Sequence, residues 1–125
     1  MKSPVFINTL IFVADLDRAT RFYRDVLGQT VLESAGDFVR LENGLALHTG
    51  RALEETTFGE SEPDSRPYGR RNLVLYFESD EIEAMLERVS TVSELIHPIE
   101  TQAWGQRVFR FHDPDGHIVE IGEPM

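Results

Sequence analysis

Residues 111–120, FHDPDGHIVE, carry the most informative pattern in the sequence. Its centre, Asp113-Pro114-Asp115-Gly116, has the composition of a tight turn, because aspartate, proline and glycine each favour turn positions. On either side, residues 106–112 and 118–121 show the apolar alternation that is typical of strands. The stretch therefore predicts two strands joined by a turn at the end of the chain.

The same pattern occurs once more in the first half of the sequence. Residues 44–50 (GLALHTG) align without a gap with residues 116–122 (GHIVEIG). The alignment sets His48 against Glu120. Only two copies exist, so the pattern indicates a duplication and not a solenoid of many repeats.

Each half of the chain predicts the element order β-α-β-β-β. The strands expected in the first half are residues 5–13, 30–34, 38–41 and 45–48, with a helix over 16–27 that Asp15 caps and Gly28 ends. Those expected in the second half are residues 72–77, 95–99, 106–112 and 118–121, with a helix from Ser79 or Asp80 to about Val89. Pro98 interrupts the strand at 95–99, so we expect it at a sheet edge.

The connection between the halves is long, polar and acidic. Residues 50–70 carry several glycines and prolines and predict a loop with at most a short helical turn, acting as a linker or as a functional lid. We expect the linker. The chain would then be one domain over 1–125, made of a module at about 4–50, a connecting loop at about 51–70 and a module at about 71–123.

Composition excludes several classes of protein. The 125 residues hold 12 Lys and Arg against 22 Asp and Glu, a formal charge of −10, which repels nucleic acid and anionic membrane surfaces. There is no cysteine, hence no disulfide scaffold, cysteine nucleophile or thiolate metal site. The apolar run at 5–14 is too short to span a bilayer and lacks a cleavage site. We expect a cytoplasmic protein with neither a nucleic-acid nor a membrane partner.

Two motifs together resemble a known superfamily. Residues 13–28 (VADLDRATRFYRDVLG) and 111–120, in this order inside a duplicated βαβββ unit, are similar to the vicinal oxygen chelate proteins. These include glyoxalase I, bleomycin- and fosfomycin-resistance proteins and extradiol dioxygenases. The resemblance covers nearly the whole chain. It implies an α+β fold whose two βαβββ modules form a cupped mixed sheet around a small-molecule site, commonly in a homodimer, but it does not specify an activity.

By the same resemblance, the metal ligands of the family correspond to Asn8, His48, Asn72 and Glu120. His48 and Glu120 are suitable donors for Zn²⁺, Ni²⁺, Mn²⁺ or Fe²⁺, whereas an asparagine offers only a neutral amide oxygen. We therefore expect one divalent ion at most, absent or weakly bound. A bound metal would polarise vicinal oxygens of a substrate. Without it, His48 and Glu120 would act as an acid/base pair, or would only hydrogen-bond across the cup.

Four further side chains are candidates for substrate binding. Strand alternation puts Arg110 on the face opposite its two flanking phenylalanines, where it would bind a carboxylate, phosphate or phosphonate, or pair with a local acid. Trp104 lies in a turn-rich stretch and would stack on a flat ligand, or anchor the loop or a dimer interface. Tyr76 and Phe12 would form apolar walls of the site, or ordinary core.

Two functions from different classes stay open. The first is a glyoxalase-like enzyme of lyase, isomerase or dioxygenase-related type, acting on a small oxygenated or carbonyl compound with His48 and Glu120 at its centre. Authentic lactoylglutathione lyase activity is not expected. The second is a metal-free protein that sequesters a ligand, as bleomycin-resistance proteins do. Asn8 and Asn72 favour the second function, whereas the presence of both His48 and Glu120 favours the first.

Overall fold

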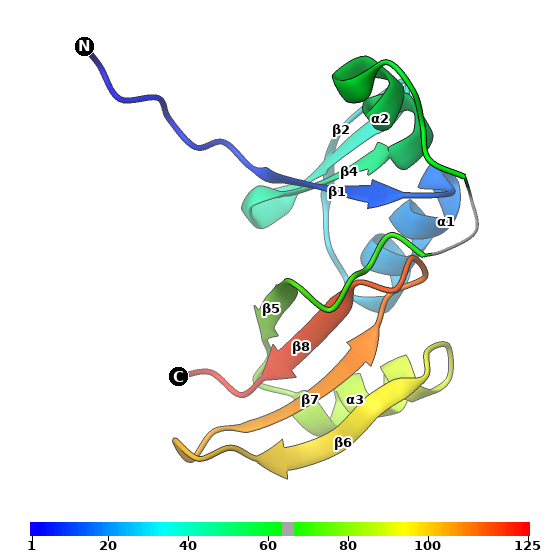
Figure 1. Ribbon diagram of the computed structural model, residues 1–125. Helices are drawn as coiled ribbons and strands as arrows, with labels where there is room; N and C mark the ends of the chain where they lie inside the picture. Colours follow the sequence, from blue (N-terminus) through cyan, green and yellow to red (C-terminus); the bar gives the residue numbers. More distant parts are fainter. Residues whose placement is uncertain (64–66) are drawn as a thin grey trace. The chain divides into compact units, whose positions relative to one another are not determined.

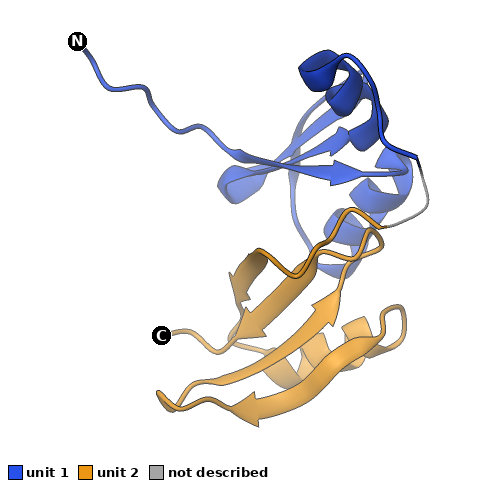
Figure 2. Ribbon diagram, viewed as in Figure 1, with its two compact units in different colours: residues 1–64 blue, residues 65–125 orange. Residues whose placement is uncertain are grey.

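The chain divides into two compact units, Met1–Asp64 and Ser65–Met125 (Figures 1 and 2). The structure, a computed structural model, describes residues 1–63 and 67–125. Each unit has the order strand, helix and three strands, and each forms its own four-stranded mixed sheet. The α+β class and the two βαβββ modules predicted from the sequence are confirmed.

The first unit forms a sheet in the order β1-β4-β3-β2. Its elements are β1 (Thr9–Val13), α1 (Leu16–Arg21), β2 (Val31–Ala35), β3 (Phe38–Leu41) and β4 (Leu45–Thr49). β1 runs parallel to β4, and the other neighbours are antiparallel. The expected cap is present, since Asp15 accepts a hydrogen bond from the Arg18 N–H at 3.0 Å. The predicted helix over 16–27 continues past α1 as a π-helical turn, η1 (Phe22–Val26).

The prediction of a strand over 5–13 is wrong for its first four residues. β1 begins at Thr9, which pairs with Leu45, the first residue of β4. Because the 3₁₀ turn η2 (Glu42–Gly44) precedes β4, the residues before Thr9 have no strand to pair with on that side. They extend away from the sheet, and Val5, Phe6 and Ile7 are 79%, 80% and 72% exposed (Figure 1).

The predicted connecting loop contains a helix. α2 (Gly50–Phe58) follows β4 directly and ends at Gly59, which has a φ of 83° and donates its N–H to the Glu55 carbonyl at 2.9 Å. The prediction of at most a short helical turn is therefore wrong over these nine residues. Glu54 is buried and its carboxylate accepts from the Glu62 N–H at 2.7 Å, which ties the helix to the segment after it. The part of the predicted loop at 64–66 lies outside the described residues.

The second unit forms a sheet in the order β5-β8-β7-β6. Its elements are β5 (Val74–Glu78), α3 (Ile82–Ser90), β6 (Leu95–Thr101), β7 (Arg107–His112) and β8 (Ile118–Gly122). β6 is an edge strand, as predicted from Pro98. Phe109 and Phe111 are fully buried and stack with their ring centroids 5.8 Å apart.

The helix of the second unit starts later than expected. α3 begins at Ile82, and its N-cap residue Glu81 makes no side-chain cap hydrogen bond. Ser79 instead accepts from the Glu81 N–H at 3.0 Å, in the turn before the helix. The prediction that Ser79 or Asp80 caps the helix is therefore wrong. Apart from the first strand, the predicted strands of both units agree with the observed ones to within two residues at each end.

The predicted turn at Asp113–Gly116 is confirmed. Gly116 donates its N–H to the Asp113 carbonyl at 3.0 Å and has a φ of 85°, which glycine adopts without strain. The Asp113 carboxylate also accepts from the N–H groups of Asp115 and His117, each at 2.9 Å. Over the residues that the structure describes, no helix has the length and apolar character needed to cross a membrane.

Candidate functional site

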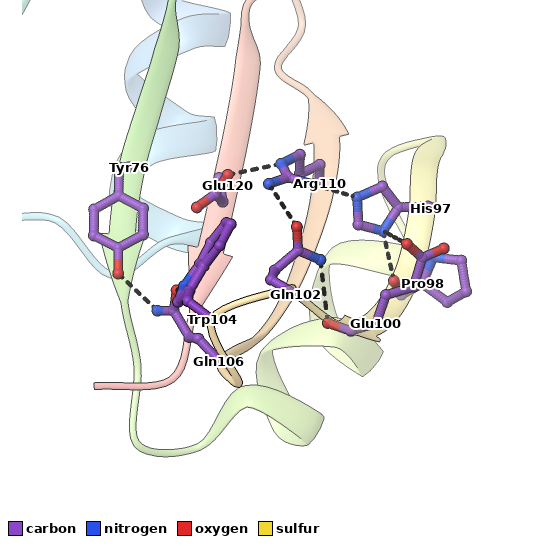
Figure 3. A network of polar contacts seen from close by, with 9 residues as sticks. All are labelled: Tyr76, His97, Pro98, Glu100, Gln102, Trp104, Gln106, Arg110 and Glu120. Atoms are coloured by element: carbon purple, nitrogen blue, oxygen red, sulfur yellow. Dashed lines mark hydrogen bonds and ion pairs between the residues drawn. The ribbon is translucent and has the colours of Figure 1, made fainter. Parts of the chain in front are cut away.

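Four side chains form a row across the second sheet, with one residue on each strand. Tyr76 on β5 lies in register with Glu120 on β8, Glu120 with Arg110 on β7, and Arg110 with His97 on β6. Residues in register on neighbouring strands project from the same face of a sheet. Strand alternation places this face opposite the buried Phe109. We call Tyr76, Glu120, Arg110 and His97 the polar row (Figure 3).

An ion pair lies at the centre of the polar row. Arg110 Nε donates to Glu120 Oε1 at 2.7 Å, and the two side chains are only 25% and 12% exposed. Arg110 Nη2 donates to Gln102 Oε1 at 3.3 Å, and Nη1 lies 2.9 Å from His97 Nε2. All three nitrogens of the guanidinium are thus engaged. Glu120 Oε2, by contrast, has no hydrogen-bond partner among the described residues.

The tautomer of His97 follows from its neighbours. Its Nδ1 lies 2.7 Å from the Pro98 carbonyl, an acceptor only, so Nδ1 carries the hydrogen. Its Nε2 then accepts from Arg110. The Pro98 carbonyl and the Arg110 guanidinium thus engage both ring nitrogens of His97.

A buried amide connects two exposed aromatic rings to this face. Gln106 Oε1 accepts from the Trp104 indole N–H at 2.8 Å, and Gln106 Nε2 donates to the Tyr76 hydroxyl at 2.8 Å and to the Glu123 carbonyl at 2.7 Å. The amide lies over Gly122, where a Cβ atom would clash with Gln106 Nε2. Trp104 is 57% exposed and Tyr76 46%, so both rings are fixed by hydrogen bonds and yet accessible.

The hydroxyl of Tyr76 is also a donor. It donates to Glu78 Oε2 at 2.6 Å. This hydrogen bond is the main reason why the pKa of Tyr76 is raised, and the negative charge of Glu120 raises it further. Tyr76 therefore stays neutral beside two carboxylates.

The equivalent row of the first sheet is aromatic. His48 on β4 lies in register with Phe12 on β1 and with Phe38 on β3, and the Phe38 and His48 ring centroids are 6.4 Å apart. His48 thus holds the position in the first sheet that Glu120 holds in the second, as the sequence alignment suggested. Its Nδ1 lies 3.0 Å from the Thr49 carbonyl, which leaves Nε2 as the acceptor nitrogen.

The predicted site residues therefore fall into two groups. Glu120, Arg110 and Tyr76 lie together in the second unit, with Trp104 joined to them through Gln106. His48 and Phe12 lie together in the first unit. Both predicted asparagines, residues 8 and 72, precede the first strand of their unit, and the first is half-buried while the second is exposed. The pairing of His48 with Glu120 stays a prediction.

The donor set fits a divalent metal poorly. Among the described residues of either unit, no three His, Asp or Glu side chains are grouped as a metal site. Glu120 Oε1 is already engaged by Arg110 Nε at 2.7 Å, so only Oε2 of this carboxylate would be left for a metal ion. The amide oxygens of Asn8 and Asn72 carry no compensating charge. We therefore derive no chemical step through a metal.

Three residues of the site were not predicted from the sequence, His97, Gln102 and Gln106. Gln106 shares a strand face with Val108 and Arg110 by period-two counting, and it is buried. A glutamine at a buried position needs partners for its amide, and this was the available signal. Gln102 lies in the turn before β7 and gave no comparable signal.

Comparison with known proteins identifies relatives across nearly the whole chain. Residues 6–125 match the family model described as a glyoxalase-like domain. A protein of unknown function from Agrobacterium tumefaciens str. C58 is 50% identical, with a TM-score of 0.93 and coverage of 100% of this chain and 98% of that one. No curated protein matches the sequence.

Two further solved structures carry more specific names. A glyoxalase/bleomycin resistance protein/dioxygenase from Nocardioides is 25% identical, with a TM-score of 0.75 and coverage of 98% of this chain and 85% of that one. A lactoylglutathione lyase from Agrobacterium tumefaciens is 26% identical, with a TM-score of 0.68 and coverage of 98% and 96%.

Proposed function

We propose that this chain, which belongs to the glyoxalase-like domain family, binds a small organic molecule without using a metal ion. The observation that carries the proposal is the ion pair between Arg110 and Glu120 at 2.7 Å. It places a guanidinium beside the carboxylate that the family resemblance assigns to the metal. The ligand would lie on the face of the second sheet that bears the polar row.

The state of the polar groups favours recognition over proton transfer. Arg110 and Glu120 are held together by a hydrogen bond from Nε to Oε1 at 2.7 Å. The acceptor nitrogen of His97 is occupied by Arg110. Groups that are held in one state by their neighbours are suited to orienting a ligand. The exposed rings of Trp104 and Tyr76 add the apolar surface that a small-molecule site needs.

The test is ligand binding with and without metal. Thermal unfolding of the protein would be measured against a set of small molecules, once after treatment with EDTA and once after addition of Zn²⁺, Ni²⁺, Mn²⁺ or Fe²⁺. We expect ligands whose stabilisation of the protein is the same in both conditions and is lost in Glu120→Gln. Binding that requires an added metal, or a stoichiometric metal that disappears in His48→Ala/Glu120→Ala, would contradict the proposal.

A second candidate function is the glyoxalase-like enzyme with Glu120 as a general base. It is favoured by Glu120 Oε2, which has no hydrogen-bond partner in the described part of the chain and is thus able to accept a proton. Incubation with hydroxyacetone in D₂O would detect abstraction of a proton next to a carbonyl group. Enzyme-dependent deuterium incorporation that Glu120→Gln abolishes would favour this function over simple binding.

A homodimer is also proposed. Val5, Phe6 and Ile7 form an apolar segment ahead of β1 that is mostly exposed in a single chain. Burial of such a segment against a second copy would remove this apolar surface from water. Light scattering after gel filtration is expected to give twice the chain mass of 14.3 kDa. A monomer at high protein concentration would contradict this proposal.

A further inference from the structure

We propose that the group recognised on this face is an organic cation of the alkylammonium type, paired with Glu120 and in contact with the rings of Trp104 and Tyr76. This assignment rests on the function proposed above and names the chemistry of its ligand. It concerns the side chains of the second unit only.

The first argument concerns the sign of the charge that a ligand on this face would carry. Arg110 is the cation of the polar row, and its three nitrogens already point to Glu120, His97 and Gln102. The expectation that Arg110 binds an anionic ligand would therefore require the ligand to share the guanidinium with Glu120. A carboxylate ligand in that place would also be repelled by the Glu120 charge.

The second argument concerns the negative charge of this face that Arg110 does not balance. Glu120 is matched by Arg110, but Glu78 and Glu100 carry two further negative charges at the two ends of the network. Glu78 accepts from the Tyr76 hydroxyl, and Glu100 Oε2 lies 3.6 Å from His97 Nδ1, which is also 2.7 Å from the Pro98 carbonyl. The net charge of the face is thus negative. It agrees in sign with the charge of −10 on the whole chain.

The third argument concerns the aromatic surface. A cation is attracted to the face of an aromatic ring, most strongly to that of tryptophan. The Trp104 indole is held by its N–H on Gln106, whose amide also holds the Tyr76 hydroxyl, so both rings are fixed before a ligand arrives. Figure 3 shows the indole extending from Gln106 towards Glu120. Prior fixation reduces the conformational entropy that binding would otherwise remove.

The raised pKa of Tyr76 is consistent with these three arguments. It reflects first the hydrogen bond to Glu78 and then burial. The negative charges of Glu78 and Glu120 raise the pKa further, whereas the hydrogen bond from Gln106 lowers it.

Three probes of similar shape and different charge test the inference. Choline is the cation, 3,3-dimethyl-1-butanol is its neutral counterpart, and 3,3-dimethylbutanoate is the anion. Each would be titrated into the full chain while the indole N–H resonance of Trp104, the one tryptophan of the chain, is followed by NMR. We expect saturable shifts with choline, affinity lower by about tenfold or more for the alcohol, and no shift with the anion.

The outcomes separate this inference from the function on which it rests. Equal or tighter binding of the alcohol or the anion overturns the organic-cation inference while a metal-free binding site remains. If none of the three probes shifts the Trp104 resonance, the inference is likewise wrong. The metal-independent ligand screen described above then decides the proposed function by itself.

Matched variants test the roles of the named residues. Glu120→Gln keeps an acceptor for Arg110 and is expected to weaken choline binding by about tenfold, as loss of a charge-assisted contact does. Glu83→Gln removes the same charge from an exposed residue of α3 and should leave the affinity unchanged. Equal effects of the two variants would show that only the overall charge matters, and would overturn the inference. Thermal unfolding of each variant verifies that it is folded.

The aromatic contact has its own pair of variants, followed by calorimetry because the indole signal is removed. Trp104→Phe retains a ring without the hydrogen bond to Gln106, whereas Trp104→Ala removes the ring. We expect the alanine variant to lose about fivefold in choline affinity and the phenylalanine variant to lose less. Unchanged affinity in Trp104→Ala would exclude the indole as part of the site.

Discussion

Substitution of Gly122 by alanine is expected to break the amide connection beneath the two exposed rings. Gly122 belongs to β8, and its backbone conformation is open to any residue, so the change introduces no backbone strain. The new Cβ would clash with Gln106 Nε2 and would lie 3.1 Å from Gln106 Cδ. Because Nε2 is the far end of a flexible side chain, the amide would move and the strand would stay.

The expected loss of stability follows from the two hydrogen bonds that Gln106 Nε2 donates. One goes to the Tyr76 hydroxyl at 2.8 Å and the other to the Glu123 carbonyl at 2.7 Å. Each contributes about 0.5–1.5 kcal/mol net, so losing both costs about 1–3 kcal/mol. Replacement of a glycine by alanine returns about 0.4–1 kcal/mol through the unfolded chain. We therefore expect the free energy of unfolding to fall by about 1–2 kcal/mol.

The assay is a double-mutant cycle with Gln106→Ala. Unfolding by urea would be followed by far-ultraviolet circular dichroism, with Trp104 fluorescence as a second signal. With Gln106 removed, the obstacle to the new methyl group is gone, and Gly122→Ala should raise the free energy of unfolding by about 0.4–1 kcal/mol. If Gly122→Ala lowers the free energy of unfolding equally in the wild-type protein and in Gln106→Ala, the explanation through Gln106 is wrong. The clash would then be with Val108 Cγ1, which lies 3.3 Å from the new Cβ.

Three further predictions concern the second unit. Phe109→Ala, in the buried stack, should lower the free energy of unfolding by about 3–5 kcal/mol in urea titrations, and a cost below about 1 kcal/mol would contradict the packing described. In a spectrophotometric titration Tyr76 should ionise at higher pH than an ordinary tyrosine, and Glu78→Gln should bring its pKa down; no change would mean that the hydrogen bond is absent in solution. The guanidinium of Arg107 lies 2.7 Å from the Glu83 carboxylate and lowers the pKa of Glu83 below its ordinary value of 4.5. The ionised pair therefore stabilises the fold above pH 4.5. This stabilisation is lost as the pH falls through the lowered pKa of the folded state. Arg107→Gln should therefore flatten the dependence of stability on pH below about 4.5, and an unchanged slope would argue against the pair.

The fold was predictable because its main signals are local. The Asp113–Gly116 turn forms from the side-chain and backbone groups of its own residues, and strand alternation depends on neighbours two apart. Strand length, in contrast, depends on a partner, so the start of β1 at Thr9 could not be obtained from the apolar run alone. α2 was missed because a polar helix lacks a broad apolar stripe.

The candidate site was predicted in part. The interpretation of Arg110 left two partners open, an anionic ligand or a local acid, and the structure shows the local acid, Glu120. The role of Gln106 was not predictable because its amide joins residues 30 and 17 positions away in the sequence. Hydrogen bonds of this range depend on the sheet register, which a single sequence does not specify.

The two equivalent rows have a consequence for how such a protein diversifies. The first sheet places Phe12, His48 and Phe38 at the positions where the second sheet places Tyr76, Glu120 and Arg110. The backbone hydrogen bonds of both rows are the same in kind and independent of the side chains. Side chains in the row of one sheet can therefore be substituted while the row of the other sheet is kept. Combined substitution of these six side chains would create new binding specificities without a change of the backbone.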